Sequence, residues 1–380
     1  MKFHKICIIG DGLSGLTTAL TLQNLSVTID LFYRNKTFNN FKDKRTTAIS
    51  ESNYKFLLRH SGEKFRKIIN PIKKVSLFYE DNNKFLNFFN FKEENKNMMY
   101  IFQNKNLKKL IVSTLKKNKK IKFINKNIKN IDATNCFIQC EKDKKFYDLI
   151  ILCLGNNSTI NNILPPRKIQ KSYDEIAFTL LVKSNLDIKN SSQFFLKEGP
   201  LAILPYDKNK ISIIWSLKKN FFIKNEKKIK NLTIEKLKKI FGKKIKFKIS
   251  EYQNFPIYLS LRKKYYDKNI LFFGGTIHSI HPIAGQGFNL FLRDVKKLRE
   301  LIQKNLSLGI QLKNSSLLKE FYNSRNPENL LTGLGVDLTN SFFKENRILD
   351  PAKRILLEKI SNNKILESLG KSLADKGLYF

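Results

Sequence analysis

Apolar runs alternate with amphipathic stretches in the first part of the chain, a pattern typical of alternating strands and helices. An apolar run at Ile6–Ile9 precedes helical spacing over Leu16–Leu22, and a second apolar run follows at Val27–Phe32. The segment FYDLIILCLG, ending at Gly155, contains a continuous apolar run that predicts a central parallel strand buried on both faces. These patterns predict an α/β lobe built on a parallel sheet.

The middle of the chain, from Glu175 to Ile257, changes to strand-like runs separated by polar, lysine-rich turns. The runs IAFTLLV, GPLAILPY, ISIIWS and FPIYLSL predict a second lobe formed by a mostly antiparallel sheet. The other expected elements are strand material at Lys74–Phe91 and Tyr100–Gln103, a helix at Asn104–Lys117, a strand at Ile121–Asn127, a helix at Thr233–Phe241 and helices from about Asn289 onward.

Gly10, Gly12 and Gly15 form a GxGxxG motif between the first expected strand and the first expected helix. This placement is typical of a dinucleotide-binding βαβ unit, in which a helix N-terminus faces a pyrophosphate. An ordinary strand-turn-helix corner is the simpler alternative. The acid expected for a ribose hydroxyl at the end of the second strand is not evident, because alternation allows Asp30 to face the other way.

The segment HPIAGQGFNLFLRD, residues 281–294, follows a short apolar run at Asn269–Phe273. Pro282 would fix the entry to a helix, while Gly285 and Gly287 remove side-chain bulk where a flat or anionic ligand would approach the backbone. The plain alternative is again a strand-turn-helix corner. Arg45, in the turn FKDKRTTAIS, could reach a pyrophosphate or a flavin edge, although a surface arginine is the commoner explanation.

The composition supports a folded protein with a strong positive charge. The 380 residues are 42% hydrophobic and 12% aromatic, which is enough for two packed lobes. The formal charge of +39, from 71 Lys+Arg against 32 Asp+Glu, is spread along the whole chain. This spread favours solvated lysine-rich faces first and attraction to an anionic membrane second. No specific nucleic-acid partner is expected, because arginine patches and base-stacking motifs are lacking.

The cysteines predict neither disulfides nor a metal site. Cys7 and Cys153 lie in apolar runs, while Cys136 and Cys140 have no second CxxC or nearby histidine pair. No apolar run approaches the ~18 residues that span a bilayer. We therefore expect a reduced, cytoplasmic protein whose membrane contact would be peripheral, on the inner membrane face.

Taken together, these segments resemble a known family. GDGLSG, RTTAIS, YIFQNKNL, YDLIILCLGNNS, QFFLKEGPLAILPY, FPIYLSL and GGTIHSIHPIAGQGFNLFLRD occur in the order seen in the aromatic ring hydroxylases of ubiquinone biosynthesis. These are FAD-dependent monooxygenases of the para-hydroxybenzoate hydroxylase fold. The resemblance covers about residues 3 to 345, and HPIAGQGFN with GPLAILP is specific to the ubiquinone branch.

The resemblance implies a set of cofactor and substrate roles. NADPH or NADH would reduce FAD, and O2 would then serve to hydroxylate an electron-rich prenylated phenol or quinone intermediate. Pro282, Gly285 and Gln286 would line the flavin ring, and no acid or base residue is assigned. The cofactor-binding residues that the resemblance implies are Gly10, Gly12, Gly15, Arg45, Gln103, Gly155, Gly275, Gly285, Gly287, Phe288 and Asn289.

The chain departs from the family pattern at three positions. Gly275 and Leu154 stand where relatives usually have aspartates, and Asn161 replaces a trailing arginine. The loss of two charged hydrogen bonds would weaken FAD binding by roughly a hundredfold to ten-thousandfold. The alternative function is therefore a flavin-poor or non-catalytic relative that binds quinone intermediates or scaffolds a ubiquinone-biosynthesis complex.

The expected domain organisation interleaves two lobes. The FAD-binding lobe comprises residues 1–72, 100–172 and 265–345, the last part carrying the flavin loop. The substrate lobe comprises residues 73–99 and 173–264. Residues 346–380 form a C-terminal helical segment in this prediction.

Overall fold

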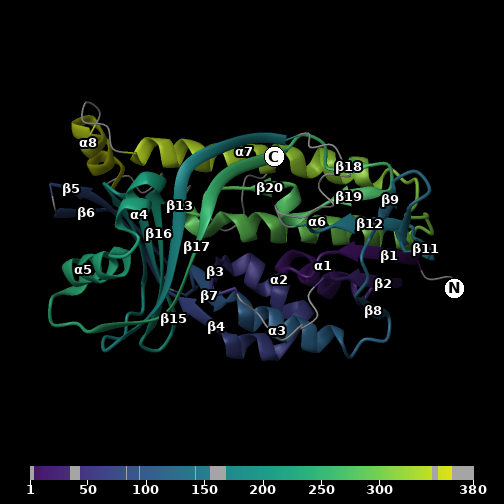
Figure 1. The fold of residues 1–380 in the computed structure, drawn as a ribbon, viewed down its shortest axis with the longest axis horizontal. Helices are drawn as coiled ribbons and strands as arrows, with labels where there is room; N and C mark the ends of the chain where they lie inside the picture. The colour runs from purple at the N-terminus through teal and green to yellow at the C-terminus, as the bar shows by residue number, and fades with distance from the viewer. Residues whose placement is uncertain are drawn as a thin grey trace.

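The computed structural model describes residues 4–34, 43–82, 84–93, 95–141, 143–154, 168–344 and 350–361. Two large sheets organise these residues: a six-stranded, mostly parallel sheet and an eight-stranded, mostly antiparallel sheet. The two sheets occupy opposite ends of the molecule in Figure 1, and the long helix α7 (Leu317–Phe343) contacts strands of both. The predicted fold class, an α/β parallel-sheet lobe with a mostly antiparallel lobe and C-terminal helices, is confirmed.

The six-stranded sheet places the N-terminal strand at its centre. Its order is β18 (Tyr266–Asp267), β19 (Ile270–Phe272), β12 (Leu149–Leu152), β1 (His4–Ile9), β2 (Val27–Phe32) and β8 (Ile121–Ile124). All neighbours are parallel except β18 and β19. The carboxyl ends of β1, β12 and β19 therefore lie side by side, which is where ligands bind in open parallel sheets.

The eight-stranded sheet contains two very long strands. Its order is β20 (His278–Ser279), β17 (Phe247–Arg262), β13 (Lys168–Ser184), β16 (Lys210–Lys218), β15 (Gly199–Asp207), β14 (Ser191–Leu196), β5 (Lys74–Asp81) and β6 (Lys84–Lys92). Only the β14–β5 pair is parallel among the pairs described. In Figure 1, β13 and β17 curve together from the α7 side of the molecule toward β15.

The other described strands form two three-stranded sheets. One consists of β3 (Thr46–Ile49), β7 (Met99–Gln103) and β4 (Ile69–Ile72), and the other of β11 (Asp143–Phe146), β10 (Phe137–Cys140) and β9 (Asn130–Asp132). The other helices are α1 (Leu13–Leu22), α2 (Glu51–Ser61), α3 (Asn104–Leu115), α4 (Lys219–Asn225), α5 (Ile229–Phe241), α6 (Gln286–Ser307) and α8 (Asp350–Ser361), with 3-10 turns η1 (Glu63–Ile68), η3 (Gly274–Thr276) and η4 (Ile283–Gly285).

The elements with strong apolar periodicity lie close to their predicted positions. The expected strand material at Lys74–Phe91 is two strands, because a turn with Asn82 at φ +44° separates β5 from β6. The helix expected at Thr233–Phe241 begins four residues earlier, and α6 begins at Gln286 rather than Asn289. Short or polar elements such as β3, α2 and α4 were not predicted, since their sequences have little periodicity.

The largest apolar core lies around the parallel sheet. Ile6, Ile8 and Ile150 are fully buried in it, together with Leu16 of α1 and Leu298 of α6. A second core lies between the antiparallel sheet and helices α4 and α5, around Trp215, which is 1% exposed. Among the helices described here, none combines the length and apolar character needed to cross a membrane.

Candidate functional site

The glycine-rich turn between β1 and α1 requires glycine at two positions for packing. Gly10 has φ +125°, and a Cβ atom there would lie 2.3 Å from the carbonyl oxygen of Cys153. A Cβ atom on Gly15 would lie 2.0 Å from the carbonyl oxygen of Gly10. Both contacts are impossible for a side chain, so these glycines allow α1 to start directly against β12.

Gly12 has the opposite environment, because it faces open space. No atom described by the structure lies within 4 Å of a Cβ atom placed on Gly12. Gly12 is also the N-cap of α1, which has no side-chain cap and no acidic residue in its first turn. The exposed amides and the positive end of the helix dipole are suited to an anion such as a pyrophosphate. The residues present therefore fit the diphosphate end of a dinucleotide.

Asp30 lies away from this turn. It is 4% exposed and accepts a hydrogen bond of 2.9 Å from Tyr147 Oη, and Lys5 Nζ lies 3.7 Å from its carboxylate. In the sheet it stands beside Cys7 in the middle of β1, not at the carboxyl end where the glycines lie. Asp30 is thus part of the packed interior of the sheet, as its alternation in the sequence suggested.

Gly274 and Gly275 follow β19 and lie next to the glycine-rich turn. Gly274 has φ +62°, and a Cβ atom on it would lie 2.7 Å from Cβ of Ser14 in α1. Gly275 has no positive φ, so its backbone conformation does not require glycine. Among the described residues, a Cβ atom on Gly275 would meet only the carbonyl oxygen of Leu154, at 4.0 Å. The two positions that lack the family's aspartates are therefore close neighbours in space.

Thr276 fixes the turn that contains these glycines. Its hydroxyl lies 2.9 Å from the carbonyl oxygens of Leu152 and Phe273 and 3.4 Å from that of Leu154. The Thr276 side chain is 3% exposed. A threonine after a glycine pair carries no strong sequence signal, which explains why sequence reasoning missed its role.

The segment His281–Asn289 brings its glycines to the same end of the parallel sheet. Gly285 is the N-cap of α6 in the left-handed conformation, with φ +63°, and its Cβ position lies 3.7 Å from Cβ of Ala48. A Cβ atom on Gly287 would lie 3.8 Å from Ile280. Pro282 and Gln286 are partly exposed beside them. Both α1 and α6 contact η3, so the two glycine-opened helix starts are neighbours.

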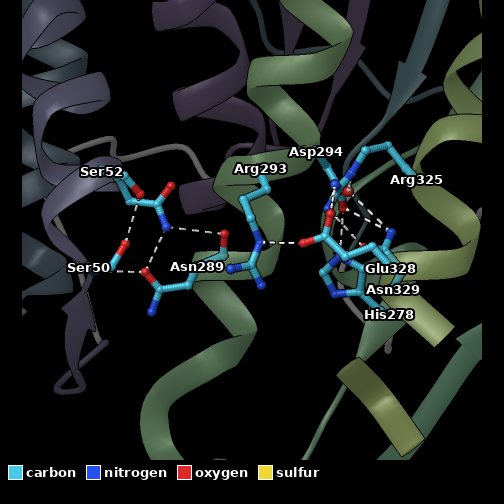
Figure 2. A network of polar contacts seen from close by, with 10 residues as sticks. Ser50, Ser52, His278, Asn289, Arg293, Asp294, Arg325, Glu328 and Asn329 are labelled. Atoms are coloured by element: carbon cyan, nitrogen blue, oxygen red, sulfur yellow. Dashed lines mark hydrogen bonds and ion pairs between the residues drawn. The ribbon is translucent and has the colours of Figure 1, made fainter. Parts of the chain in front are cut away.

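Asn289 ties the start of α6 to β3 and α2. Its Oδ1 accepts hydrogen bonds from Ser50 N at 3.0 Å and from Asn53 Nδ2 at 2.8 Å. Its Nδ2 donates to the carbonyl oxygens of Ala48 and Gly285 at 3.0 and 3.1 Å. Figure 2 shows this side chain between the helix and the Ser50 segment. A buried amide with both ends satisfied holds the loop against β3.

A second polar cluster lies one turn further along α6. The Asp294 carboxylate is fully buried and receives bonds of 2.7 Å from His278 Nε2 and from Arg325 Nε. Arg325 also pairs with Glu328, and Arg293 Nε lies 2.8 Å from that glutamate (Figure 2). Burial opposes ionisation of Asp294, but Arg325 and His278 hold its pKa below the usual range. This cluster joins α6 to α7 and is structural.

Arg45 and Gln103 lie at adjacent ends of β3 and β7, where Thr46 pairs with Gln103. The Arg45 guanidinium makes two bonds of 2.8 Å to the Asp43 carboxylate, and Asn104 Nδ2 donates to the same carboxylate at 3.0 Å. Although burial opposes it, the bonds from Arg45 lower the pKa of Asp43. Arg45 is thus a half-exposed, ordered charge beside the site, and the acid that orients it was missed.

Lys108 of α3 connects this cluster to the glycine-rich turn, since its Nζ lies 3.9 Å from Asp11. Phe288 packs against the main core, and its ring centroid lies 6.2 Å from that of Phe102 and 5.4 Å from that of Phe291. Gly155 and Asn161 lie outside the described residues. The structure thus collects the glycines of three turns, with Arg45 and Gln103, around the carboxyl end of the parallel sheet.

The inner face of the antiparallel sheet completes the site. Phe178, Leu180 and Val182 of β13 face the core under α4 and α5, so Ala177 and Thr179 face the opposite way. On that inner face, Gln253 pairs with Thr179, and its Oε1 accepts a 3.1 Å bond from Lys44 N. The inner face therefore meets the Arg45 turn.

Two hydroxyl groups on this inner face have no hydrogen-bond partner in the part of the chain that the structure describes. Thr179 is 1% exposed and Ser212 of β16 is fully buried, and neither hydroxyl has a hydrogen-bond partner among the described residues. Ser212 pairs with Leu181 on β13 and with Leu204 on β15. Leu204 packs with Ala48, which is the residue nearest to a Cβ atom placed on Gly285. Buried hydroxyls are normally hydrogen-bonded, so these two are candidates for contact with a ligand. The hydroxyls of Thr17, Thr46 and Ser191 are also buried without a partner among the described residues.

The cysteines lie in the core. All four are buried and free, and burial raises the pKa of the Cys153 thiol to about 12. Within the described ranges, no group of histidine, cysteine and acidic residues could hold a metal ion.

Comparison with known proteins shows what the chain is similar to. Residues 148–325 match a family model described as an FAD binding domain. The ubiquinone biosynthesis monooxygenase COQ6 of Dictyostelium discoideum is 24% identical over 443 residues, covering 95% of this chain and 89% of that protein. The ubiquinone hydroxylase UbiL of Rhodospirillum rubrum is 30% identical over 166 residues, covering 42% of this chain and 38% of that protein. The crystal structure of p-nitrophenol 4-monooxygenase PnpA from Pseudomonas putida matches with a TM-score of 0.77 at 15% identity, covering 99% of both chains.

The two-lobe architecture is thus the fold seen in p-nitrophenol 4-monooxygenase PnpA, and the glycine-rich turn before α1 is of the kind that holds the diphosphate of a dinucleotide. The sequence matches extend this likeness beyond the fold and cover nearly the whole chain. The chain is thus similar along nearly its whole length to a monooxygenase of ubiquinone biosynthesis, and residues 148–325 match an FAD binding domain.

Proposed function

We propose that this protein is an FAD- and NAD(P)H-dependent monooxygenase that uses O2 to hydroxylate the aromatic ring of a prenylated phenol or quinone precursor in ubiquinone biosynthesis. The observation that supports this most directly is the grouping of the open Gly12 turn with the Gly285–Gly287 segment, near a sheet face that carries two buried hydroxyls without partners among the described residues. The similarity to COQ6 along nearly the whole chain supports the pathway.

In this proposal, Gly10, Gly12 and Gly15 hold the pyrophosphate of FAD at the N-terminus of α1. Arg45 and Gln103 lie along the ribityl and flavin parts. The remaining contacts come from backbone at Gly275 and at Gly285, Gly287, Phe288 and Asn289, while Gly155 is proposed from the sequence alone. When bound, FAD supplies the electron-transfer and oxygen-activating chemistry that no side chain of the protein can supply.

The protein contributes positioning and exclusion of water. Pro282, Gly285 and Gln286 would line the flavin ring, where the absence of bulky side chains lets a planar ring approach the backbone. Thr179 and Ser212 would hydrogen-bond an oxygen of the phenol or quinone ring, since both hydroxyls are buried without a partner in the described structure. The surrounding apolar side chains, such as Leu181 and Leu204, suit a prenyl tail.

The test combines spectroscopy with turnover. Purified protein reconstituted with FAD should show the yellow absorption of bound oxidised flavin. It should also oxidise NADPH or NADH faster when a prenylated phenol is present, with a product one oxygen atom heavier by mass spectrometry. Protein that stays colourless with added FAD would instead favour a non-catalytic relative that binds quinone intermediates.

We also propose peripheral contact with an anionic membrane. The formal charge is +39, and Leu330, Leu331, Leu334 and Leu338 are exposed along one side of α7. Their spacing of three, four and eight residues places them on one helix face. Such a face, on a basic protein with a lipid-soluble substrate, is suited to the surface of an anionic bilayer.

A further inference from the structure

Glu175 of β13 is placed in the interior by a bulge in the sheet. The pairing of β13 with β17 shifts between Ser172 and Glu175, and Asp174 adopts the left-handed conformation with φ +51°. A β-bulge bends a strand and re-aims the side chains next to it. As a result, Glu175 is 6% exposed and points toward the segment that precedes α6.

His281, the first residue of that segment, forms a direct hydrogen bond with Glu175. His281 is fully buried, and its Nε2 lies 2.8 Å from Glu175 Oε2. Its Nδ1 accepts a hydrogen bond of 3.2 Å from Ile283 N–H. Because Nδ1 is an acceptor, Nε2 carries the ring proton and donates it to the carboxylate. One ring nitrogen therefore bonds to the loop and the other to the antiparallel sheet.

The second oxygen of Glu175 reaches the end of α7. Asn340 Nδ2 lies 3.3 Å from Glu175 Oε1, and Lys344 Nζ lies 2.9 Å from it. Burial alone would raise the pKa of Glu175, but the bonds from His281 and Lys344 lower it to about 2. The carboxylate therefore joins β13, the loop before α6 and the end of α7 in one charged hydrogen-bond cluster.

We propose that the hydrogen bond between Glu175 and His281 fixes the position of the flavin-facing segment His281–Asn289 relative to the antiparallel sheet and α7. We call this pair of residues the brace. Because of it, FAD and the ring substrate bind cooperatively. The coupling rests on the proposed function, while the brace itself rests on the geometry. Glu175, Ala177 and Thr179 alternate along β13 and share its inner face. A substrate held at Thr179 would therefore order the same strand that holds the loop.

This arrangement predicts reciprocal effects. A ligand that orders β13 lowers the cost of ordering the loop for a second ligand, and each ligand must then tighten the other by the same factor. Glu175 and His281 are accordingly positioning residues. Neither is required to touch FAD or to transfer a proton.

The first experiment measures FAD dissociation constants by quenching of flavin fluorescence. Glu175→Ala and His281→Phe should each weaken FAD binding by about tenfold, and the double variant should be no weaker than either single variant. Asp337→Ala is the matched control, because Lys171 and Asp337 also link β13 to α7, at 3.0 Å, without contacting the loop. The control should bind FAD as the wild type does.

The second experiment repeats the titration with a short-chain prenylated phenol present. The phenol should tighten FAD binding to the wild type by about fivefold or more, and the effect should disappear in Glu175→Ala. If that variant does not fold, Glu175→Gln replaces it in both experiments, because it retains the side-chain shape while removing the charge that holds Lys344 and Asn340.

The results separate the brace from the activity. Unchanged FAD affinity in both single variants, or additive losses in the double variant, would overturn the brace. FAD affinity that depends on Glu175 and His281, together with no effect of any phenol, would support the brace as a loop-positioning device and overturn the coupling. Failure of hydroxylation with intact FAD binding would count against the proposed function alone.

Discussion

In the glycine-rich turn, Gly12 leaves space for FAD and Gly15 allows close packing. Substituting each by alanine separates these two roles. Gly12→Ala should leave stability within about 1 kcal/mol of the wild type, since its φ of −69° suits alanine and its Cβ position is open. It should nevertheless raise the FAD dissociation constant by about tenfold or more, because the methyl group occupies the space for the pyrophosphate.

Gly15→Ala should behave in the opposite way. Its Cβ atom would lie 2.0 Å from the carbonyl oxygen of Gly10, so the helix must move, at a cost of about 3 kcal/mol or more. Chemical denaturation of the FAD-free proteins and a flavin titration measure both quantities. Equal stability of the two variants would contradict this division of roles.

Gly275 offers a test of how FAD is held without the family's aspartate. Gly275→Asp meets no steric barrier from the described residues, because the backbone has no positive φ and the nearest described atom to the new Cβ would lie 4.0 Å away. A charge-assisted hydrogen bond to FAD would contribute ~1.5 to 3 kcal/mol, before the cost of desolvating the carboxylate. We expect the FAD dissociation constant to fall by about tenfold to a hundredfold.

The control for this substitution is Gly275→Asn, which has a similar size but no charge. Asn should give a smaller gain, since neutral hydrogen bonds are weaker than charged ones. An unchanged or higher dissociation constant in a well-folded Gly275→Asp variant would show that FAD is held differently here than in relatives with an aspartate.

Residue-level prediction from the sequence worked where the constraint is local. Gly10, Gly12 and Gly15 were recognisable because a strand, a turn and a helix occur within 20 residues. Glu175 was not, because its role depends on a bulge and on partners 106 and 165 residues away. Asp43 was also missed, since an acid in a loop gives no sign of the arginine that it orients.

At the scale of elements, the apolar pattern predicted β1 and β2 to within two residues, while it placed the start of α6 three residues too late and the end of β8 three residues too far along the chain. It did not predict the three-stranded sheet β9 to β11, whose strands are three or four residues long. The apolar pattern also did not predict the order of the strands within the sheets. The parallel pairing of β14 with β5 joins Ser191 to Val75, and such distant pairings are decided by packing of whole layers.

Strand β13 carries a testable substrate contact on its inner face. Thr179→Val keeps the volume and removes a buried hydroxyl without a partner in the described structure, so stability should be unchanged or higher by about 1 kcal/mol. If the hydroxyl binds the ring oxygen, KM for the prenylated phenol should rise by about tenfold with FAD affinity unchanged.

Ser212→Ala on the neighbouring strand should have the same signature. Ser191→Ala is the control, because Ser191 is also buried and its hydroxyl also lacks a partner among the described residues, but it lies on β14. Steady-state kinetics with each variant measures the effect. Equal KM values for Thr179→Val and the control would exclude Thr179 from the substrate site.

At the scale of the whole molecule, Glu175 joins the two lobes through a charge, and acid should weaken this connection. The folded pKa of Glu175 is lowered to about 2, so its stabilisation is present above the ordinary glutamate pKa of ~4.3 and is lost as pH falls toward 2. The charged groups around it are Lys344 at 2.9 Å and, nearby, Lys171 with Asp337.

The expected outcome is a difference that depends on pH. Glu175→Gln should be less stable than the wild type at pH 7, by at most about 3 kcal/mol, and the gap should shrink below pH ~4.3. Asp294 and Asp43, whose pKa values are also lowered, lose stabilisation in both proteins and cancel in the comparison. Denaturant unfolding at several pH values measures the gap, and a gap that widens in acid would refute the assignment.

The net charge and the leucine face of α7 act together in the last prediction. With +39 formal charges, the protein should bind vesicles that contain anionic lipid and should dissociate as salt rises to about 0.5 M, because screening removes the long-range attraction. If charge alone drove binding, substitution of the leucines would leave vesicle binding unchanged. Leu338 is 70% exposed and Leu334 is 43% exposed, and insertion of each into the interface would contribute up to ~1.5 kcal/mol.

A double substitution of Leu334 and Leu338 by serine should therefore weaken vesicle binding by about tenfold to a hundredfold at constant salt, with FAD binding unchanged. The matched control replaces Leu308 and Ile310, which are 63% and 44% exposed after α6, by serine. It removes a similar apolar area from a different surface and should leave vesicle binding intact. Equal losses in both double variants would mean that α7 has no special role, and binding that persists at high salt would mean that charge does not drive it.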